Sequence, residues 1–165
     1  MTTVTINVHD ANSVKNAINQ IQEYKNWLKR KTNELMRRLA ELGAETARNH
    51  YASGFIDENE DVVVTIEPTQ GGYLITAAGE DVYFLEFGSG VAAGNGYDTS
   101  VIEPPVDITP GSWSRTHGTG EFERYGSWHH DGKKYTMTVP RMGMYFGVKE
   151  IQMQVPNIAT EVFNS

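Results

Sequence analysis

The stretch DVYFLEFGSGVAAGNG, from Asp81 to Gly96, joins an apolar run to a glycine-rich segment and decides which folds this chain can adopt. Gly88, Gly90 and Ala93 have the G-x-G-x-x-A spacing of a dinucleotide-binding turn. That turn also needs a parallel strand before it and a helix after it, whose N-terminus meets the pyrophosphate. The residues after Ala93 are Gly-Asn-Gly, where a helix does not start well. We therefore expect no nucleotide site. We expect instead that the glycines let the chain leave a strand with positive φ.

The residues before this stretch have the composition of strands. Val62–Glu67 and Tyr73–Ala77 are rich in β-branched and aromatic residues and flank the turn sequence PTQGG, which predicts a hairpin. The turn sequence AAGED then leads into Val82–Phe87, which we interpret as a third strand. Residues 60–88 are thus expected to form antiparallel strands.

Residues 10–52 show helical periodicity. Apolar residues recur at steps of three and four, and Lys25 and Thr32 fill the gaps in this series. The apolar residues are Val14, Ile18, Ile21, Leu28, Leu35, Leu39 and Leu42. Asp10, Asn12 and Ser13 are candidate N-caps. The stretch is long for one helix, so we expect a break near Glu23–Asn26.

The segment 89–139, which we call the arm, is rich in Gly, Pro, Ser, Thr and Asn and has no period. Such a long loop in a small domain is usually functional or disordered, and its aromatic residues are not typical of a disordered linker. Asp131-Gly132 predicts a two-residue hairpin turn near its end. The aromatic residues either form a binding surface or pack the arm onto its own domain; they include Trp113, Phe122, Tyr125, Trp128 and Tyr135.

Residues 141–164 are expected to be helical, with Met144, Val148 and Ile151 on one face and Pro156 opening a last short helix. The whole chain, residues 1–165, is then predicted to be a single α+β domain. Its helices pack on a small antiparallel sheet, and the arm extends between them.

Composition limits the function. The 165 residues include no cysteine, which excludes disulfides and thiolate chemistry, and the formal net charge is −7. An acidic chain is not expected to hold DNA phosphates. No apolar run has the length of a membrane span, and the first residues do not have the pattern of a signal peptide.

Charge is unevenly distributed along the chain. Residues 24–51 hold seven Lys and Arg against three Glu, whereas residues 57–86 hold eight Asp and Glu and no Lys or Arg. These segments are either solvated faces or surfaces that contact each other within or between subunits.

Candidate catalytic and metal-binding residues are few. The metal-capable residues of the arm are His117, Glu121, His129, His130 and Asp131. Adjacent residues on a strand point to opposite faces, so His129 and His130 cannot easily share one ion. A small metal-dependent enzyme using His117, His129 or Asp131 stays an alternative to histidines in solvent or at an interface.

Glu86 lies between two apolar residues and has no identifiable catalytic partner. We expect its carboxylate either to pair with a basic residue of the N-terminal helix or to accept N–H bonds from the Gly88 turn. Ser89 is not in a G-x-S-x-G frame, so it is not expected to be a nucleophile.

The order of these segments resembles the neck or tail-completion proteins of long-tailed bacteriophages, often labelled minor capsid or tail-component proteins. In that family an apolar residue precedes Glu-[Phe/Tyr]-Gly-[Thr/Ser], matched here by Leu85, Glu86, Phe87, Gly88 and Ser89. A second element, Arg-Pro-Phe followed by six intervening residues and then Glu, opens the last helix of the family. It is matched by Arg141, Met144, Tyr145 and Glu150, while Met142 and Gly143 replace Pro-Phe.

The resemblance implies a structural virion protein without catalysis or cofactor. It implies a homo-oligomeric ring at the head–tail interface, assembled in the cytoplasm of the bacterial host. The implied partners are the head connector or head-closure protein on one side and the tail-tube or terminator protein on the other. DNA would pass through without specific binding, and no membrane is involved. A tail-terminator or head-closure ring is the alternative role in the same assembly. The candidate residues for contacts with partners are Glu86, Phe87, Gly88, Ser89, Trp113, Tyr125, Trp128, Tyr135, Arg141 and Tyr145.

Overall fold

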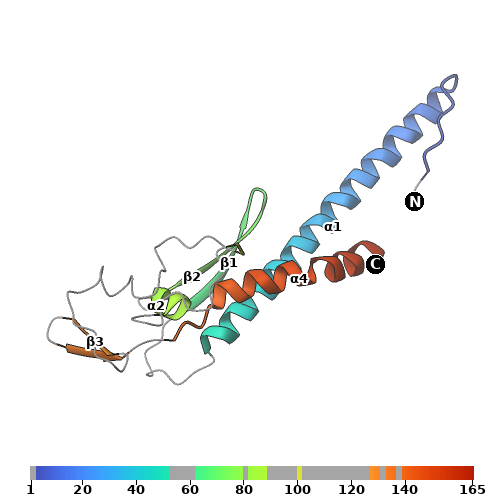
Figure 1. The fold of residues 1–165 in the computed structure, drawn as a ribbon. Helices are drawn as coiled ribbons and strands as arrows, with labels where there is room; N and C mark the ends of the chain where they lie inside the picture. Colours follow the sequence, from blue (N-terminus) through green and yellow to red (C-terminus); the bar gives the residue numbers. More distant parts are fainter. Residues whose placement is uncertain are drawn as a thin grey trace.

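The computed structural model describes residues 3–52, 62–79, 82–88, 100–101, 127–130, 133–136 and 139–165. The elements, in chain order, are α1 (Ala11–Ala52), β1 (Val63–Thr69), β2 (Gly72–Ala78), α2 (Val82–Phe87), β3 (Ser127–His130), β4 (Lys133–Thr136) and α4 (Gly143–Asn164). Two long helices lie beside a small antiparallel sheet (Figure 1). The predicted α+β class is confirmed.

Helix α1 is continuous for 42 residues, so the break predicted near Glu23–Asn26 is wrong. No Gly or Pro interrupts the chain between residues 11 and 42, and the rings of Tyr24 and Trp27 stack at 5.5 Å along the helix surface. At the start of the helix, Asp10 is the N-cap. Its carbonyl accepts the first helical bond, from Val14 N, and its side chain accepts a 2.9 Å bond from Asn12 N.

The strands β1 and β2 form the predicted hairpin, with Val64 opposite Ala77 and Ile66 opposite Ile75. This inner face packs on the last turns of α1, where Ala44, Ala47 and Tyr51 join Val64 and Leu85 in one core cluster. The guanidinium of Arg48 donates to the carbonyl oxygen of Val64, at 2.7 Å from Nη2, and so attaches the hairpin to α1.

Helices α1 and α4 run antiparallel and cross where both have glycine. A Cβ atom added to Gly147 would lie 2.6 Å from the carbonyl oxygen of Gly43, so the two backbones are in direct contact. Beyond this crossing the contacts become polar and aromatic. Arg38 pairs with Glu161 at 2.5 Å, and Trp27 meets Phe163 edge-on at 5.8 Å.

Helix α4 is one helix that contains Pro156, so the separate last helix predicted from this proline is wrong. Proline removes one helical hydrogen bond and does not always end the helix. Here the hydroxyl of Thr160 donates to the carbonyl oxygen of Pro156 at 2.7 Å. Among the described residues, no helix combines the length and hydrophobicity that a membrane span requires.

The segment Val82–Phe87 is helix α2, so the third strand predicted there is wrong. The N–H of Gly88 donates to the carbonyl oxygen of Phe84 at 2.8 Å and closes the last helical turn. Burial of Leu85, Glu86 and Phe87 in this turn outweighs the strand preference of the apolar run.

The strands β3 and β4 confirm the second predicted hairpin. They form a separate two-stranded sheet in which His130 pairs with Lys133 and Trp128 with Tyr135. The turn residues Asp131 and Gly132, and the arm from Ser89 to Thr99 and from Ile102 to Gly126, lie outside the described residues.

Candidate functional site

Glu86 is the centre of a buried polar junction between α1, α2 and α4. Its side chain is 5% exposed and is the buried charged group among the described residues. The Tyr51 hydroxyl donates to Oε2 at 2.7 Å. The backbone N–H groups of Met144 and Tyr145 donate to Oε2 and Oε1, both at 2.9 Å. The carboxylate thus accepts three hydrogen bonds, two of them from the start of α4.

This carboxylate caps α4 from a distant part of the chain. The residue before the helix, Met142, makes no side-chain cap hydrogen bond. The first N–H groups of a helix need acceptors, and the positive end of the helix dipole favours an anion. Glu86 supplies both. The expectation that Glu86 accepts backbone N–H bonds is met, but the donors belong to α4 and not to the Gly88 turn.

The two ends of the arm are joined at the same junction. The carbonyl oxygen of Leu85 accepts bonds from Arg141 N at 2.6 Å and from Met142 N at 3.3 Å. The guanidinium of Arg141 donates to the carbonyl oxygen of Tyr51. The chain therefore leaves the core after Gly88 and re-enters it before Arg141 at one fixed point.

Two residues in this region have left-handed backbone. Gly88 has φ 77° and Met142 has φ 51° with ψ 45°. Glycine adopts such angles without steric cost, whereas for other residues they cost about 1–2 kcal/mol. Proline is restricted to φ near −65° and could not adopt the Met142 conformation. Met142 and Gly143 replace the Pro-Phe of the family motif. The chain thus enters α4 through a left-handed turn at Met142 that proline could not form.

Several predicted contact residues lie inside the subunit. Glu86, Phe87, Gly88 and Tyr145 are buried within the subunit, and Arg141 is half-buried. The side chains of Trp128 and Tyr135 are outside the described part, although their strands pair with each other. Ser89, Trp113 and Tyr125 also lie outside it.

The metal-capable residues of the arm are outside the described part or known only by their backbone. His117, Glu121 and Asp131 belong to the first group, and His129 and His130 follow each other on β3. Where the structure describes side chains, no three His, Asp or Glu residues form a group that could hold a metal ion.

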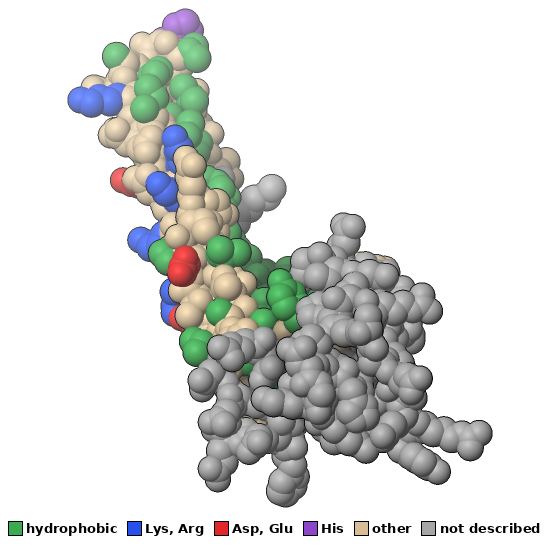
Figure 2. Space-filling model, turned by 90° about the vertical axis from the view of Figure 1, so that its left-hand side faces the viewer, with side chains coloured by type: hydrophobic (Ala, Val, Ile, Leu, Met, Phe, Trp, Pro, Cys, Tyr) green, Lys and Arg blue, Asp and Glu red, His purple; other side chains and the backbone are tan. Residues whose placement is uncertain are grey.

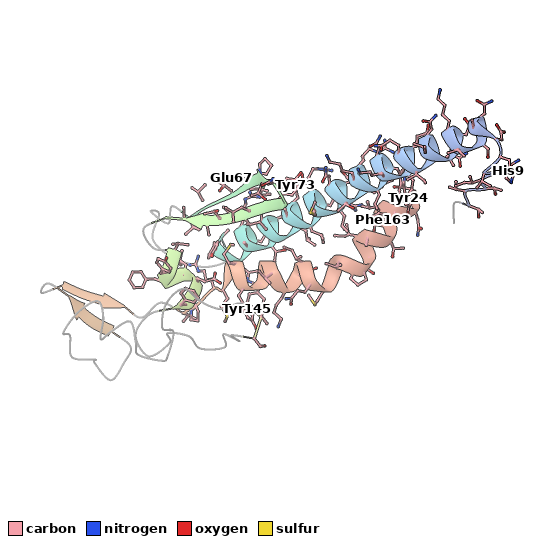
Figure 3. The ribbon with its side chains drawn as sticks, turned by 90° about the horizontal axis from the view of Figure 1, so that it is seen from above. His9, Tyr24, Glu67, Tyr73, Tyr145 and Phe163 are labelled. Atoms are coloured by element: carbon pink, nitrogen blue, oxygen red, sulfur yellow. The ribbon has the colours of Figure 1, made fainter. Side chains whose placement is uncertain are left out.

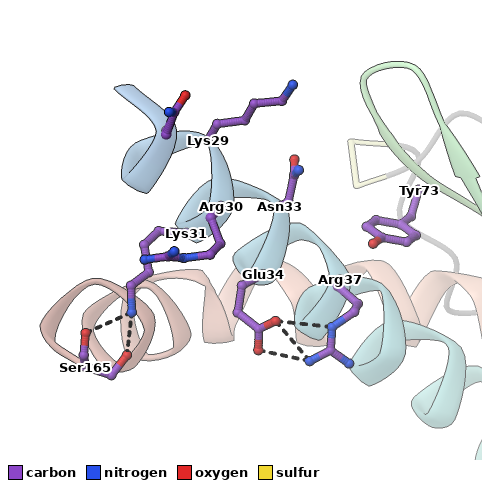
Figure 4. Close-up of a pocket in the computed structure, with 9 residues that line it drawn as sticks. Lys29, Arg30, Lys31, Asn33, Glu34, Arg37, Tyr73 and Ser165 are labelled. Carbon is purple, nitrogen blue, oxygen red and sulfur yellow. Dashed lines mark hydrogen bonds and ion pairs between the residues drawn. The ribbon is translucent and has the colours of Figure 1, made fainter. Parts of the chain in front are cut away.

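A basic groove of about 720 Å³ lies on α1 between the hairpin and the end of α4 (Figure 4). Its lining residues include Lys29, Arg30, Lys31, Arg37, Tyr73 and Ser165. The ammonium of Lys31 is used within the chain, since it donates to the backbone oxygen and hydroxyl of Ser165, each at 2.8 Å.

Arg37, at the same groove, is paired along its own helix. It bonds Glu34 at 2.9 Å and Glu41 at 2.6 Å. The hydrogen bond from Arg37 lowers the pKa of Glu34, and the bonds to both carboxylates raise the pKa of Arg37. Both groups are solvent-exposed, so these pairs contribute little to stability. No ion pair between the basic part of α1 and the hairpin is present among the described residues.

Sequence reasoning missed Tyr51 and Met142 as members of the junction. Tyr51 ends the apolar face of α1, and nothing in its neighbourhood in the sequence shows that its hydroxyl meets a residue 35 positions away. The absence of Ser, Thr, Asp or Asn before α4 was a usable signal, because a helix start without a local cap needs an acceptor from elsewhere.

Searches of protein-family models, of curated proteins and of solved structures find no match to this chain.

Proposed function

We propose that this chain is a structural virion protein of a long-tailed bacteriophage, a neck or tail-completion protein that forms a ring at the head–tail joint. Its partners in this proposal are copies of itself, the connector or head-closure protein, and the tail-tube or terminator protein. DNA passes through the ring without specific binding. A tail-terminator or head-closure ring is the alternative in the same assembly. No catalytic role is proposed.

One observation carries this proposal: the two short motifs of the resemblance meet in space. Glu86 of the first motif binds the backbone of Met144 and Tyr145 in the second. Leu85 of the first accepts the N–H of Arg141 in the second. Motifs about 55 residues apart in sequence thus form one unit, which supports treating them as a common signature and not as two chance matches.

The way in which the arm is anchored, and the charge of the chain, also support an assembly role. The junction fixes both ends of the arm, and a long aromatic segment held at its base is suited to contacts with neighbouring proteins. The acidic balance of the chain, −7, suits a ring that DNA must traverse, because it adds no favourable phosphate contact.

The test is to image the protein alone and in the virion. Electron microscopy of the purified protein is expected to show closed rings, and antibody-gold labelling of phage particles is expected at the joint between head and tail. Labelling of the capsid surface or the tail tip would contradict the proposal. Titration with Zn²⁺ addresses the metal-dependent alternative, since saturable binding with His117 as a ligand would favour an enzyme.

A further inference from the structure

The first half of α1 meets the end of α4 at Trp27 and Lys31, projects beyond it toward the N-terminus, and carries an exposed apolar stripe. Val14, Ile18, Ile21 and Leu28 are between 36% and 60% exposed. Figure 2 shows hydrophobic side chains in a band along the projecting helix, and Figure 1 shows that α4 ends near the middle of α1. At helical spacing such a stripe is normally buried against another element.

The projecting half is also basic, while the rest of the chain is strongly acidic. Residues 11–31 hold five Lys and Arg and one Glu, a net charge of +4. The whole chain carries −7, so the other residues carry −11. Lys25 lies on the same side of the helix as the apolar stripe, between Ile21 and Leu28, and Lys29 lies about one turn after Lys25. A surface that covers this stripe should therefore combine apolar and acidic side chains.

The outer face of the β1–β2 hairpin has these properties. Antiparallel pairing places Val63, Thr65 and Glu67 on one face with Ala78, Thr76 and Leu74, and all six are exposed. Val63 is 57% and Leu74 is 52% exposed. Glu67 lies directly opposite Leu74; in Figure 3 it is on the hairpin, far from the projecting end of α1 that His9 marks. Among the described residues 62–79, the acidic residue is Glu67, and there is no Lys or Arg.

We propose that the projecting half of α1 packs on the outer face of the β1–β2 hairpin of a second copy of this chain, with Lys25 and Lys29 toward Glu67. Pairing of two α1 helices is disfavoured because it brings basic residues together. The two surfaces are different, so the contact is head-to-tail and generates a ring when it closes. The inference rests on the oligomeric ring of the proposed function and names the contact that builds it.

Charge reversal tests this contact on the full-length protein. The double variant Lys25→Glu/Lys29→Glu and the single variant Glu67→Lys each place like charges across the interface. Light scattering after size exclusion is expected to show a monomer for each variant alone, with the dissociation constant raised at least about tenfold. Where the two variants alternate around the ring, every contact again joins opposite charges, and the oligomer is expected to re-form from an equal mixture.

The matched control is Arg30→Glu, on the same helix but roughly 140° around it from Lys25 at 3.6 residues per turn. It should leave the oligomer unchanged. All these side chains are exposed, and far-ultraviolet circular dichroism should show each variant folded. A monomeric wild type, a wild-type mass for Glu67→Lys, or a mixture that stays monomeric would each overturn the inference. Rings that survive both charge reversals would also overturn the inference, but they would leave the ring of the proposed function intact.

Discussion

Glu86 takes at the start of α4 the place that a capping side chain takes at most helix N-termini. A local cap would make α4 an independent element, whereas a cap from α2 ties the helix start to the end of α1 through Tyr51. The start of α4 is thus held by residues of α1 and α2. The same contact sets where the arm leaves the core, because Glu86 lies two residues before the left-handed Gly88.

We predict that Glu86→Gln destabilises the protein by about 1.5–3 kcal/mol, the range for hydrogen bonds to a buried charged group. The amide NH₂ replaces one oxygen and faces an N–H or O–H donor, and the negative charge at the helix start is lost. Urea denaturation followed by circular dichroism measures the effect. Glu45→Gln is the matched control and should stay within about 0.5 kcal/mol, since Glu45 is exposed on α1. Equal midpoints for wild type and Glu86→Gln would contradict the capping role.

At the scale of elements, the crossing of α1 and α4 organises the core. Small residues on both helices let the backbones touch, and Gly43 lies against the side chains of Ile151 and Ile75 as well. The crossing therefore brings the sheet and both helices to one point. Larger side chains at this crossing should destabilise the protein more than larger side chains elsewhere, because packed interiors accommodate added atoms poorly.

We predict that Gly147→Ala destabilises by about 1–3 kcal/mol, since the added Cβ meets a backbone oxygen at 2.6 Å that cannot move alone. This outweighs the roughly 1 kcal/mol that alanine gains over glycine in a helix. Gly43→Ala should cost less, because its closest contact is the end of the flexible Ile151 side chain. Gly71→Ala, with open space around the new atom, is the control. Urea midpoints in the order Gly71, Gly43, Gly147, from highest to lowest, are expected, and the reverse order would refute the backbone contact.

Pro156 lies inside α4 and is exposed. Pro156→Ala restores a backbone N–H and removes the ring from the helix, and we expect stabilisation of about 1–2 kcal/mol after the loss of proline's restraint on the unfolded chain. Thermal unfolding measures it. Asn157→Ala, which leaves the backbone bonding unchanged, should shift the midpoint far less. A lower midpoint for Pro156→Ala would mean that a bend at Pro156 positions the contacts of Phe163 and Glu161 with α1.

The elements that sequence reasoning placed correctly are those determined locally. Both hairpins follow from short turn sequences between β-branched and aromatic runs, and α1 follows from its apolar period. The errors arise where distant residues decide the structure. Val82–Phe87 has the composition of a strand, but the residues that bury it come from α1 and α4. The junction itself was not predictable, since its donors are 35 to 59 residues from Glu86 in sequence.

In the whole molecule, the residues of α1 that stabilise the subunit and those that form an exposed surface lie in different parts of the helix. Its last turns pack against the hairpin and α4, and the region from Trp27 to Arg38 contacts the end of α4. The part before Trp27 projects past the end of α4, and its apolar stripe contributes little to the fold of one subunit. An exposed helix of this kind is retained when another surface covers it, here the proposed neighbouring hairpin.

This separation predicts different results for deletions at the two ends. Deleting residues 1–20 should change the free energy of unfolding by less than about 1 kcal/mol and abolish the oligomer. It removes Val14 and Ile18 and the small buried Ala17, but no part of the core cluster. Deleting residues 157–165 should destabilise by about 2–4 kcal/mol, because it removes the buried Val162 and the contact of Phe163 with Trp27. Urea denaturation and light scattering on both truncated proteins provide the comparison. If the first deletion unfolds the subunit, the projecting half of α1 belongs to its core; if it leaves the oligomer intact, the subunits join through another surface.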